Sequence, residues 1–193
     1  MASLGVESDS GRQFSGGDEL IGVISSWDLS RTGETGYALV VTRGRVIGAR
    51  RAEADVEFIV YLGPGSTATA SDRERAVAAA ARLLETRQFV LAKDDIAQIL
   101  FRRPGLFSGG YAVFKTRLQA YKVEIAVVSG WNGGPLLASR TLMESLRTFS
   151  PDRLYDGKTG AIYIEELLRR DQAGSDGLMG DSLLLLDRNN PTK

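Results

Sequence analysis

Arginine side chains are the groups in this sequence best suited to chemistry. The chain has 193 residues, and its basic side chains divide into 19 Arg and 5 Lys against 24 Asp plus Glu. A guanidinium group pairs with carboxylates and phosphates through two parallel hydrogen bonds. Six arginines at or near the ends of predicted strands form a candidate patch for a lipid headgroup or a nucleic-acid backbone: Arg43, Arg45, Arg50, Arg51, Arg102 and Arg103.

A purely structural role is the alternative for these arginines. Carboxylates stand close by in the sequence at Glu53, Asp55 and Glu57, and adjacent residues such as Arg50 and Arg51 point to opposite faces of a strand. The preference for Arg over Lys also fits a GC-rich genome or a hot habitat. The net charge of zero gives no general attraction to nucleic acid or anionic membrane, so any such binding needs a local patch.

Missing residue types exclude whole classes of enzyme. The chain has no cysteine and no histidine, which removes disulfides, thiolate metal sites, Ser-His-Asp triads and imidazole bases. Asp94 and Asp95 could bind a hard cation, but a turn before a strand explains them as well. Residues 63–69 (GPGSTAT) lack the lysine of a phosphate-binding loop and fit a chain break. We therefore expect no catalysis, no cofactor and no metal, and a carboxylate-based magnesium hydrolase is the third and weakest alternative.

Large apolar side chains in polar surroundings are candidate partner contacts. Phe107 and Trp131 stand in glycine-rich loops, PGLFSGG and GWNGG, where they can anchor a membrane or a protein or fold back over the protein's own core. A run of four leucines interrupts an otherwise polar tail and also needs a partner surface: Leu183, Leu184, Leu185 and Leu186.

The elements that position these residues follow from apolar periodicity. Alternation predicts strands near residues 19–27, 37–42, 45–50, 56–62, 89–92, 96–102, 111–116 and 120–128. Arg43 and Gly44 form a tight hairpin turn, in which Gly44 can take a positive φ. Helical spacing predicts helices over residues 72–85, with Ser71 as N-cap and Glu74 completing a capping box, and over 135–149 and 161–170.

Three regions are expected along the chain: a flexible leader (residues 1–18), one domain (19–150) and a C-terminal extension with a short helix and an apolar segment (151–193). No window approaches the 18 or more apolar residues of a membrane span, and no secretory signal precedes the domain. We expect a cytoplasmic protein.

Two stretches resemble the prokaryotic pleckstrin-homology-like (PH-like) domains: residues 37–51 (YALVVTRGRVIGARR) and 94–116 (DDIAQILFRRPGLFSGGYAVFKT). The resemblance covers residues 19–149. It implies an α+β fold in which an antiparallel β-barrel or curved sheet carries an inserted helix (72–85), is closed by a C-terminal helix (135–149) and is followed by a helical tail.

The resemblance also implies a scaffold that binds lipids, peptides or proteins, usually without catalysis. We expect a non-enzymatic binding or assembly module with a protein partner or self-association, because the net charge is zero and the tail carries an unexplained apolar segment. The alternative is a module that recognises anionic lipid headgroups or nucleic acid through the arginine-rich hairpin.

Overall fold

The fold is a nine-stranded sheet with two long helices, in a computed structural model that describes residues 18–52, 56–128 and 133–162. The elements follow one another as β1 (Leu20–Arg31), β2 (Glu34–Thr42), β3 (Arg45–Arg50), β4 (Phe58–Tyr61), α1 (Ala70–Glu85), β5 (Arg87–Ala92), η2 (Lys93–Asp95), β6 (Ile96–Arg102), β7 (Gly110–Thr116), β8 (Ala120–Ile125), α2 (Gly134–Phe149), η3 (Pro151–Arg153) and β9 (Leu154–Asp156). The predicted α+β class is confirmed.

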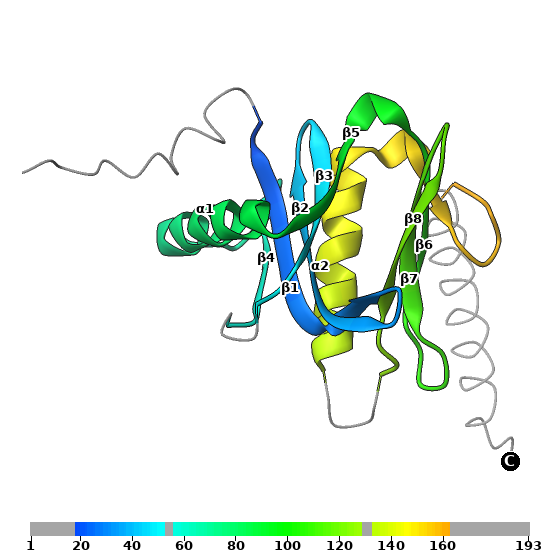
Figure 1. Cartoon of the computed structure of the whole chain (residues 1–193), viewed down its shortest axis with the longest axis horizontal. Coiled ribbons are helices and arrows are strands. Elements are labelled where there is room, and N and C mark those ends of the chain that lie inside the picture. Colours follow the sequence, from blue (N-terminus) through cyan, green and yellow to red (C-terminus); the bar gives the residue numbers. More distant parts are fainter. Residues whose placement is uncertain (1–17, 53–55, 129–132, 163–193) are drawn as a thin grey trace, which may run out of the picture.

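Strand β1 joins two groups of strands. On one side the order is β5-β3-β2-β1, and β4 pairs with the first half of β1 on its other edge, from Gly22 to Ser25. The second half of β1 pairs with β8 through Leu29 and Ser30, and the sheet continues as β8-β7-β6-β9. The pairing of β1 with β2 is irregular between Ser26 and Ser30, where such a defect bends a strand. The two groups therefore face each other across α2 (Figure 1).

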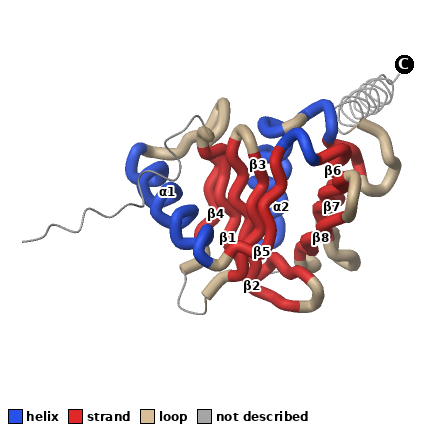
Figure 2. The backbone as a smooth tube through the Cα atoms, turned by 45° about the horizontal axis from the view of Figure 1, so that its top comes forward, coloured by secondary structure: helices blue, strands red, loops and turns tan. Residues whose placement is uncertain are grey.

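The sheet stays open, so of the two expected forms, a barrel or a curved sheet, the barrel is wrong. Its path runs from β5 at one edge to β9 at the other, and all pairs are antiparallel except β6 with β9. Closure would need the two ends of this path to pair, but β9 pairs with β6 from Ile99 to Phe101 and so occupies the edge of β6 that β5 would have to join. Helix α2 fills the space that is left between the groups (Figure 2).

Helix α2 supplies the centre of the main core. Pro135 stands in its first turn, where proline costs no helical hydrogen bond, and the Ser150 N–H donates to Leu146 O at its end. The face predicted from the spacing is buried against both strand groups, with Phe149 only 1% exposed. The predicted helix over residues 135–149 is confirmed, and it packs against the sheet.

Helix α1 covers the outer face of the first group of strands. Ala76, Ala80, Leu83 and Leu84 pack there in a second core. The predicted N-cap is wrong by two residues, because Thr69 caps the helix and its hydroxyl accepts from the Asp72 N–H at 3.2 Å. Both Thr69 and Ser71 suit the position, and the packing of the apolar face selects which one begins the helix.

Three further details differ from the sequence-based expectations. Strand β1 continues to Arg31 where a loop was expected after Trp27, and the turn that follows uses positive φ at Thr32 and Gly33. The Arg43–Gly44 hairpin is confirmed, but Gly44 is not among the residues with positive φ. Strand β9 extends the sheet beyond Ser150 by pairing in parallel with β6.

Candidate binding groove along strand β4

Strand β4 lies between the two helices. Its side chains alternate, so that Phe58 and Val60 pack in the outer core with α1, while Ile59 and Tyr61 pack against the inner core with α2. One edge of β4 pairs with β1, and in the sheet order the other edge has no strand beside it. An edge of this kind presents backbone groups that can pair with another chain.

The hydrogen-bond pattern shows which backbone groups of β4 face outward. The Leu62 N–H donates to Ile21 O at 2.7 Å, which fixes the phase of this antiparallel pair. Because ladder bonds alternate along a strand, Val60 and Phe58 also face β1, whereas Ile59 and Tyr61 direct their N–H and C=O groups away from it. The Tyr61 C=O is one of these outward groups and already has a partner, because Ser66 Oγ donates to it at 2.6 Å.

A groove of about 720 Å³ runs along this outer edge. One wall is α2, which contributes residues at helical spacing, and among them Leu137 is 54% exposed. The other wall is the β4–α1 connection with the start of α1. The lining outside β4 consists of Glu57, Pro64, Gly65, Ser66, Thr67, Ala68, Asp72, Arg75, Leu137, Arg140, Thr141 and Glu144.

Side-chain contacts hold the walls in place. The Tyr61 hydroxyl lies 2.8 Å from Thr148 Oγ1 on α2 and donates to Pro64 O at 3.2 Å, so it links helix, strand and loop. Arg75 places its guanidinium 5.3 Å from the centre of the Phe58 ring. The backbone and hydroxyl hydrogen bonds from Thr69 lower the pKa of Asp72, which keeps the cap of α1 charged. The groove is therefore preformed.

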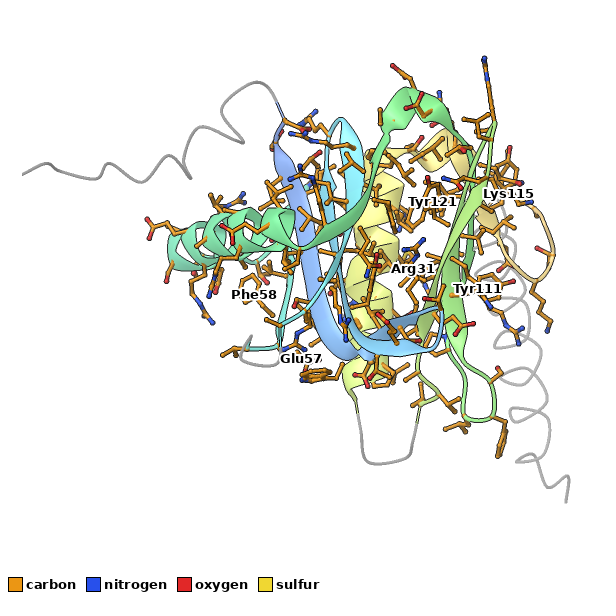
Figure 3. The ribbon with its side chains drawn as sticks, viewed as in Figure 1. Arg31, Glu57, Phe58, Tyr111, Lys115 and Tyr121 are labelled. Atoms are coloured by element: carbon orange, nitrogen blue, oxygen red, sulfur yellow. The ribbon has the colours of Figure 1, made fainter. Side chains whose placement is uncertain are left out.

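Two carboxylates stand at the end of the groove near residue 57. Ser26 Oγ donates to Glu57 Oε1, and Glu57 lies beside Phe58 at the start of β4 (Figure 3). Burial raises the pKa of Asp28, and the negative charge of Glu57 raises it further, against a weaker opposing effect of Ser26. Within the described ranges no group of three or more acidic side chains could hold a metal ion. Glu57 thus adds a carboxylate to the lining of the groove.

Three arginines of the β2–β3 hairpin form ion pairs with carboxylates that the sequence did not single out, whereas Glu53 and Asp55 lie outside the described residues. At its turn, Arg43 forms an ion pair with Glu19 and Arg45 with Asp18. At the far end of β3, Arg50 Nη1 lies 3.7 Å from Glu34 Oε2, and Arg51 is buried with its guanidinium 4.6 Å from the Trp27 ring centre.

The other two arginines lie in the second group of strands. Arg102 donates from Nη2 to Ser108 Oγ at 3.3 Å, and Arg103 lines a hollow of about 320 Å³ beside α2. Strands β2, β1, β8 and β7 separate β3 from β6 in the sheet order. Arg43 and Arg45 thus lie at the hairpin turn, Arg50 and Arg51 at the opposite end of β3, and Arg102 and Arg103 at the end of β6.

The predicted apolar contacts are placed only in part. Phe107 is 97% exposed at the tip of the β6–β7 loop and does not fold back over the core. Trp131, Leu183, Leu184, Leu185, Leu186 and most of the predicted helix 161–170 lie outside the described residues. Asp94 and Asp95 form a short 3₁₀ turn before β6, and residues 63–69 connect β4 to α1, as the structural alternatives predicted.

Two features escaped the sequence-based prediction. The first is the open edge of β4. The signal available in the sequence was that this strand is followed by GPG (residues 63–65) and an inserted helix, and not by a partner strand. The second is a cluster in which the Arg31 guanidinium lies 5.2 Å from the Phe89 ring centre and 5.8 Å from that of Tyr121, joining β5 to β8 (Figure 3). Nothing in the sequence spacing links residues 31, 89 and 121.

The groove combines backbone donors and acceptors with a helical wall, which suits an extended peptide chain. No helix in the described part of the chain is both long and apolar enough to cross a membrane. Comparison with protein-family models, with curated proteins and with solved structures gave no match.

Proposed function

We propose that the protein is a non-enzymatic binding module, built on a PH-like scaffold, that takes an extended segment of a partner protein along β4. The observation that carries this proposal is the set of outward backbone groups on β4, which open into a groove of about 720 Å³ between two helices. Strand addition to an exposed sheet edge is a common way in which domains bind peptides.

The available backbone groups support a short ladder. Ile59 offers both N–H and C=O, Tyr61 offers its N–H, and Glu57 offers its C=O. These groups lie two residues apart, as a pairing strand requires. Side chains of the bound segment alternate between the α2 wall, with Leu137 and Thr141, and the wall formed by the loop and α1.

The charges of the groove favour a protein partner over a polyanion. Arg75 and Arg140 stand among three acidic side chains, Glu57, Asp72 and Glu144, so the lining carries no positive excess. The hairpin arginines give less support to nucleic-acid or headgroup binding, because carboxylates of the same chain already neutralise Arg43, Arg45 and Arg50.

A matched pair of variants tests the strand-addition mode on peptides selected from a display library against the full chain. Ile59→Pro removes an outward N–H without breaking the ladder to β1, whereas Ile59→Ala removes the same side chain but keeps the N–H. We expect the proline variant to lose about tenfold or more in affinity beyond the loss caused by alanine.

Amide hydrogen exchange supplies an independent measurement. In the free protein the Ile59 and Tyr61 amides should exchange faster than those of Val60 and Leu62, and peptide binding should protect them selectively. Equal affinity of the two Ile59 variants, in chains that retain the native circular dichroism spectrum, contradicts strand addition. Protection that appears elsewhere on the chain contradicts the choice of groove.

A further inference from the structure

The loop between β6 and β7 ends in two exposed apolar side chains. The Gly105 N–H donates to Ser108 O at 2.7 Å and closes a tight turn. Leu106 and Phe107 occupy the tip of this turn and are 65% and 97% exposed. Tip residues are normally polar, because a turn surrounded by water cannot bury its side chains. A Leu-Phe pair at this place therefore needs another explanation.

Further apolar side chains surround this tip. The Val128 N–H donates to Gly105 O at 3.1 Å, which places the segment after β8 against the loop. Pro104 of the loop and Leu136 in the first turn of α2 both line the hollow of about 320 Å³ that also contains Arg103. Val127 and Leu136 are 44% and 51% exposed. We call the set formed by Leu106, Phe107, Val127 and Leu136 the apolar end; single exposed apolar residues are normal, but a cluster marks an interaction site.

The chain around the apolar end is basic although the protein as a whole is neutral. Between Ile96 and Met143 the one acidic residue is Glu124, which forms an ion pair with Lys122 at 2.6 Å. A second acidic residue, Asp28, is close in space, because its backbone O accepts from the Ala126 N–H. Its carboxylate, however, accepts from Ser26 Oγ at 3.5 Å. Of the basic residues in this stretch, Arg102 and Arg103 adjoin the loop and Arg140 lines the hollow, whereas Lys115 and Arg117 adjoin the β7–β8 turn. Glu144 lines the same hollow and lies 3.6 Å from Arg147.

Two of these arginines adjoin the tip directly. Arg102 and Arg103 precede the loop, and the hydrogen bond from Arg102 Nη2 to Ser108 Oγ holds that guanidinium beside it. In Figure 1 the β6–β7 loop and the start of α2 lie at the same end of the molecule, while the β7–β8 turn lies at the opposite end. Apolar side chains and guanidinium groups thus occur together at one end.

We propose that the apolar end docks the protein on an anionic lipid bilayer. Leu106 and Phe107 enter the interface between headgroups and acyl chains, and Arg102 and Arg103 pair with lipid phosphates around them. A bilayer suits this surface because a projecting tip of two side chains can sink into soft lipid, whereas a stable protein interface needs a broad complementary face. The basic flank supplies the electrostatic attraction that one small apolar insertion lacks.

Vesicle co-sedimentation of the full chain tests the proposal. We expect binding to vesicles of phosphatidylcholine mixed with phosphatidylglycerol, and little binding to phosphatidylcholine alone. The double variant Leu106→Ser/Phe107→Ser should weaken binding at least about tenfold, because it removes most of the inserted apolar area. Arg102→Ser and Arg103→Ser should each weaken it about fivefold at low salt.

Leu118 provides the matched control. It is 96% exposed in the β7–β8 turn, at the other end of the same pair of strands, so Leu118→Ser removes a similar side chain from a place that should not touch lipid. Absence of binding to the anionic vesicles overturns the proposal, and so does equal loss in the Leu118 and tip variants. A tip variant that changes the association state of the chain in solution, with vesicle binding unaltered, assigns the apolar end to a protein contact instead. None of these outcomes alters the peptide test on β4.

Discussion

Gly22 lies where β1, β4 and α2 meet, and it offers a direct test of how the groove is held. A Cβ added at this position overlaps with Ser145 Oγ on α2 and lies 3.2 Å from Val60 O on β4. Ser145 is fully buried and its hydroxyl donates to Thr141 O at 2.8 Å, so it has no free space to enter. We expect Gly22→Ala to push α2 away from the strands.

The cost can be separated into two parts by a double-mutant cycle. Gly22→Ala should lower the free energy of unfolding by about 1–3 kcal/mol, the usual cost of overpacking a core. Ser145→Ala should cost about 1 kcal/mol or less, because it removes one hydrogen bond to a helical carbonyl. In the double variant the overlap with the hydroxyl is gone, and the remaining Ser145 Cβ lies 3.4 Å away, which is an ordinary contact.

The predicted result is a strong departure from additivity. The double variant should lose about 1–2 kcal/mol less free energy of unfolding than the two single variants lose together, a coupling typical of residues in contact. Urea denaturation of the full chain, followed by circular dichroism, measures all four species, provided that the slopes agree. Additive effects within about 0.5 kcal/mol refute the contact between β1 and α2 from which the groove wall is argued.

Two further predictions follow from single side chains. Asp28→Asn should stabilise the protein at neutral pH: burial and Glu57 raise the folded-state pKa of Asp28, so its charged form opposes folding, and the advantage of Asn should vanish as the pH falls through that pKa. Thermal unfolding across a pH series tests this, and an advantage that persists in acid contradicts it. Thr69→Ala should cost about 1 kcal/mol of stability by removing the cap of α1, whereas Ser71→Ala should cost far less; the reverse order in urea denaturation rejects the assigned cap.

Local periodicity was enough to predict most elements. The strands at β2, β3, β6 and β7 and both helices appear within a few residues of their predicted positions, because alternating or helical apolar spacing reflects which face each segment must bury. The α2 face was predicted correctly from Ala138, Leu142, Leu146 and Phe149. The α1 cap was not, since two adequate capping residues stand two positions apart.

Pairing between distant segments could not be predicted. The segment after Trp27, where a loop was expected, is part of β1. Leu29 and Ser30 pair with β8, and this long-range contact buries Leu29, whereas no local alternation of apolar residues marks the segment as a strand. The same strand accepts β4 on one half and β8 on the other, and β9 takes the edge of β6 that closure of the sheet would require. No local pattern encodes that choice, since it depends on which neighbours compete for the same edge.

The candidate sites show the same difference between what a local pattern can indicate and what depends on contacts between distant segments. Phe107 was identified from the sequence because a large ring in a glycine-rich loop is unusual, but whether it projects or folds back over the core was left open, and only the structure shows that it is exposed. Of the six arginines, Arg43, Arg45 and Arg50 form ion pairs, as the structural alternative expected, but the carboxylates they pair with come from β2 and the residues before β1, which no local spacing indicates.

The sequence by itself determined the classes of residue available: with no histidine or cysteine, this chain must work through carboxylates, guanidinium groups, hydroxyls and apolar contacts. It also determined where helices and most strands form, because those depend on interactions between residues close in the chain. The tertiary structure alone decided that β4 has an open edge between two helices, and that Leu106 and Phe107 share one end with Val127 and Leu136. These features arise from packing among segments far apart in sequence, whose free energies no local pattern contains.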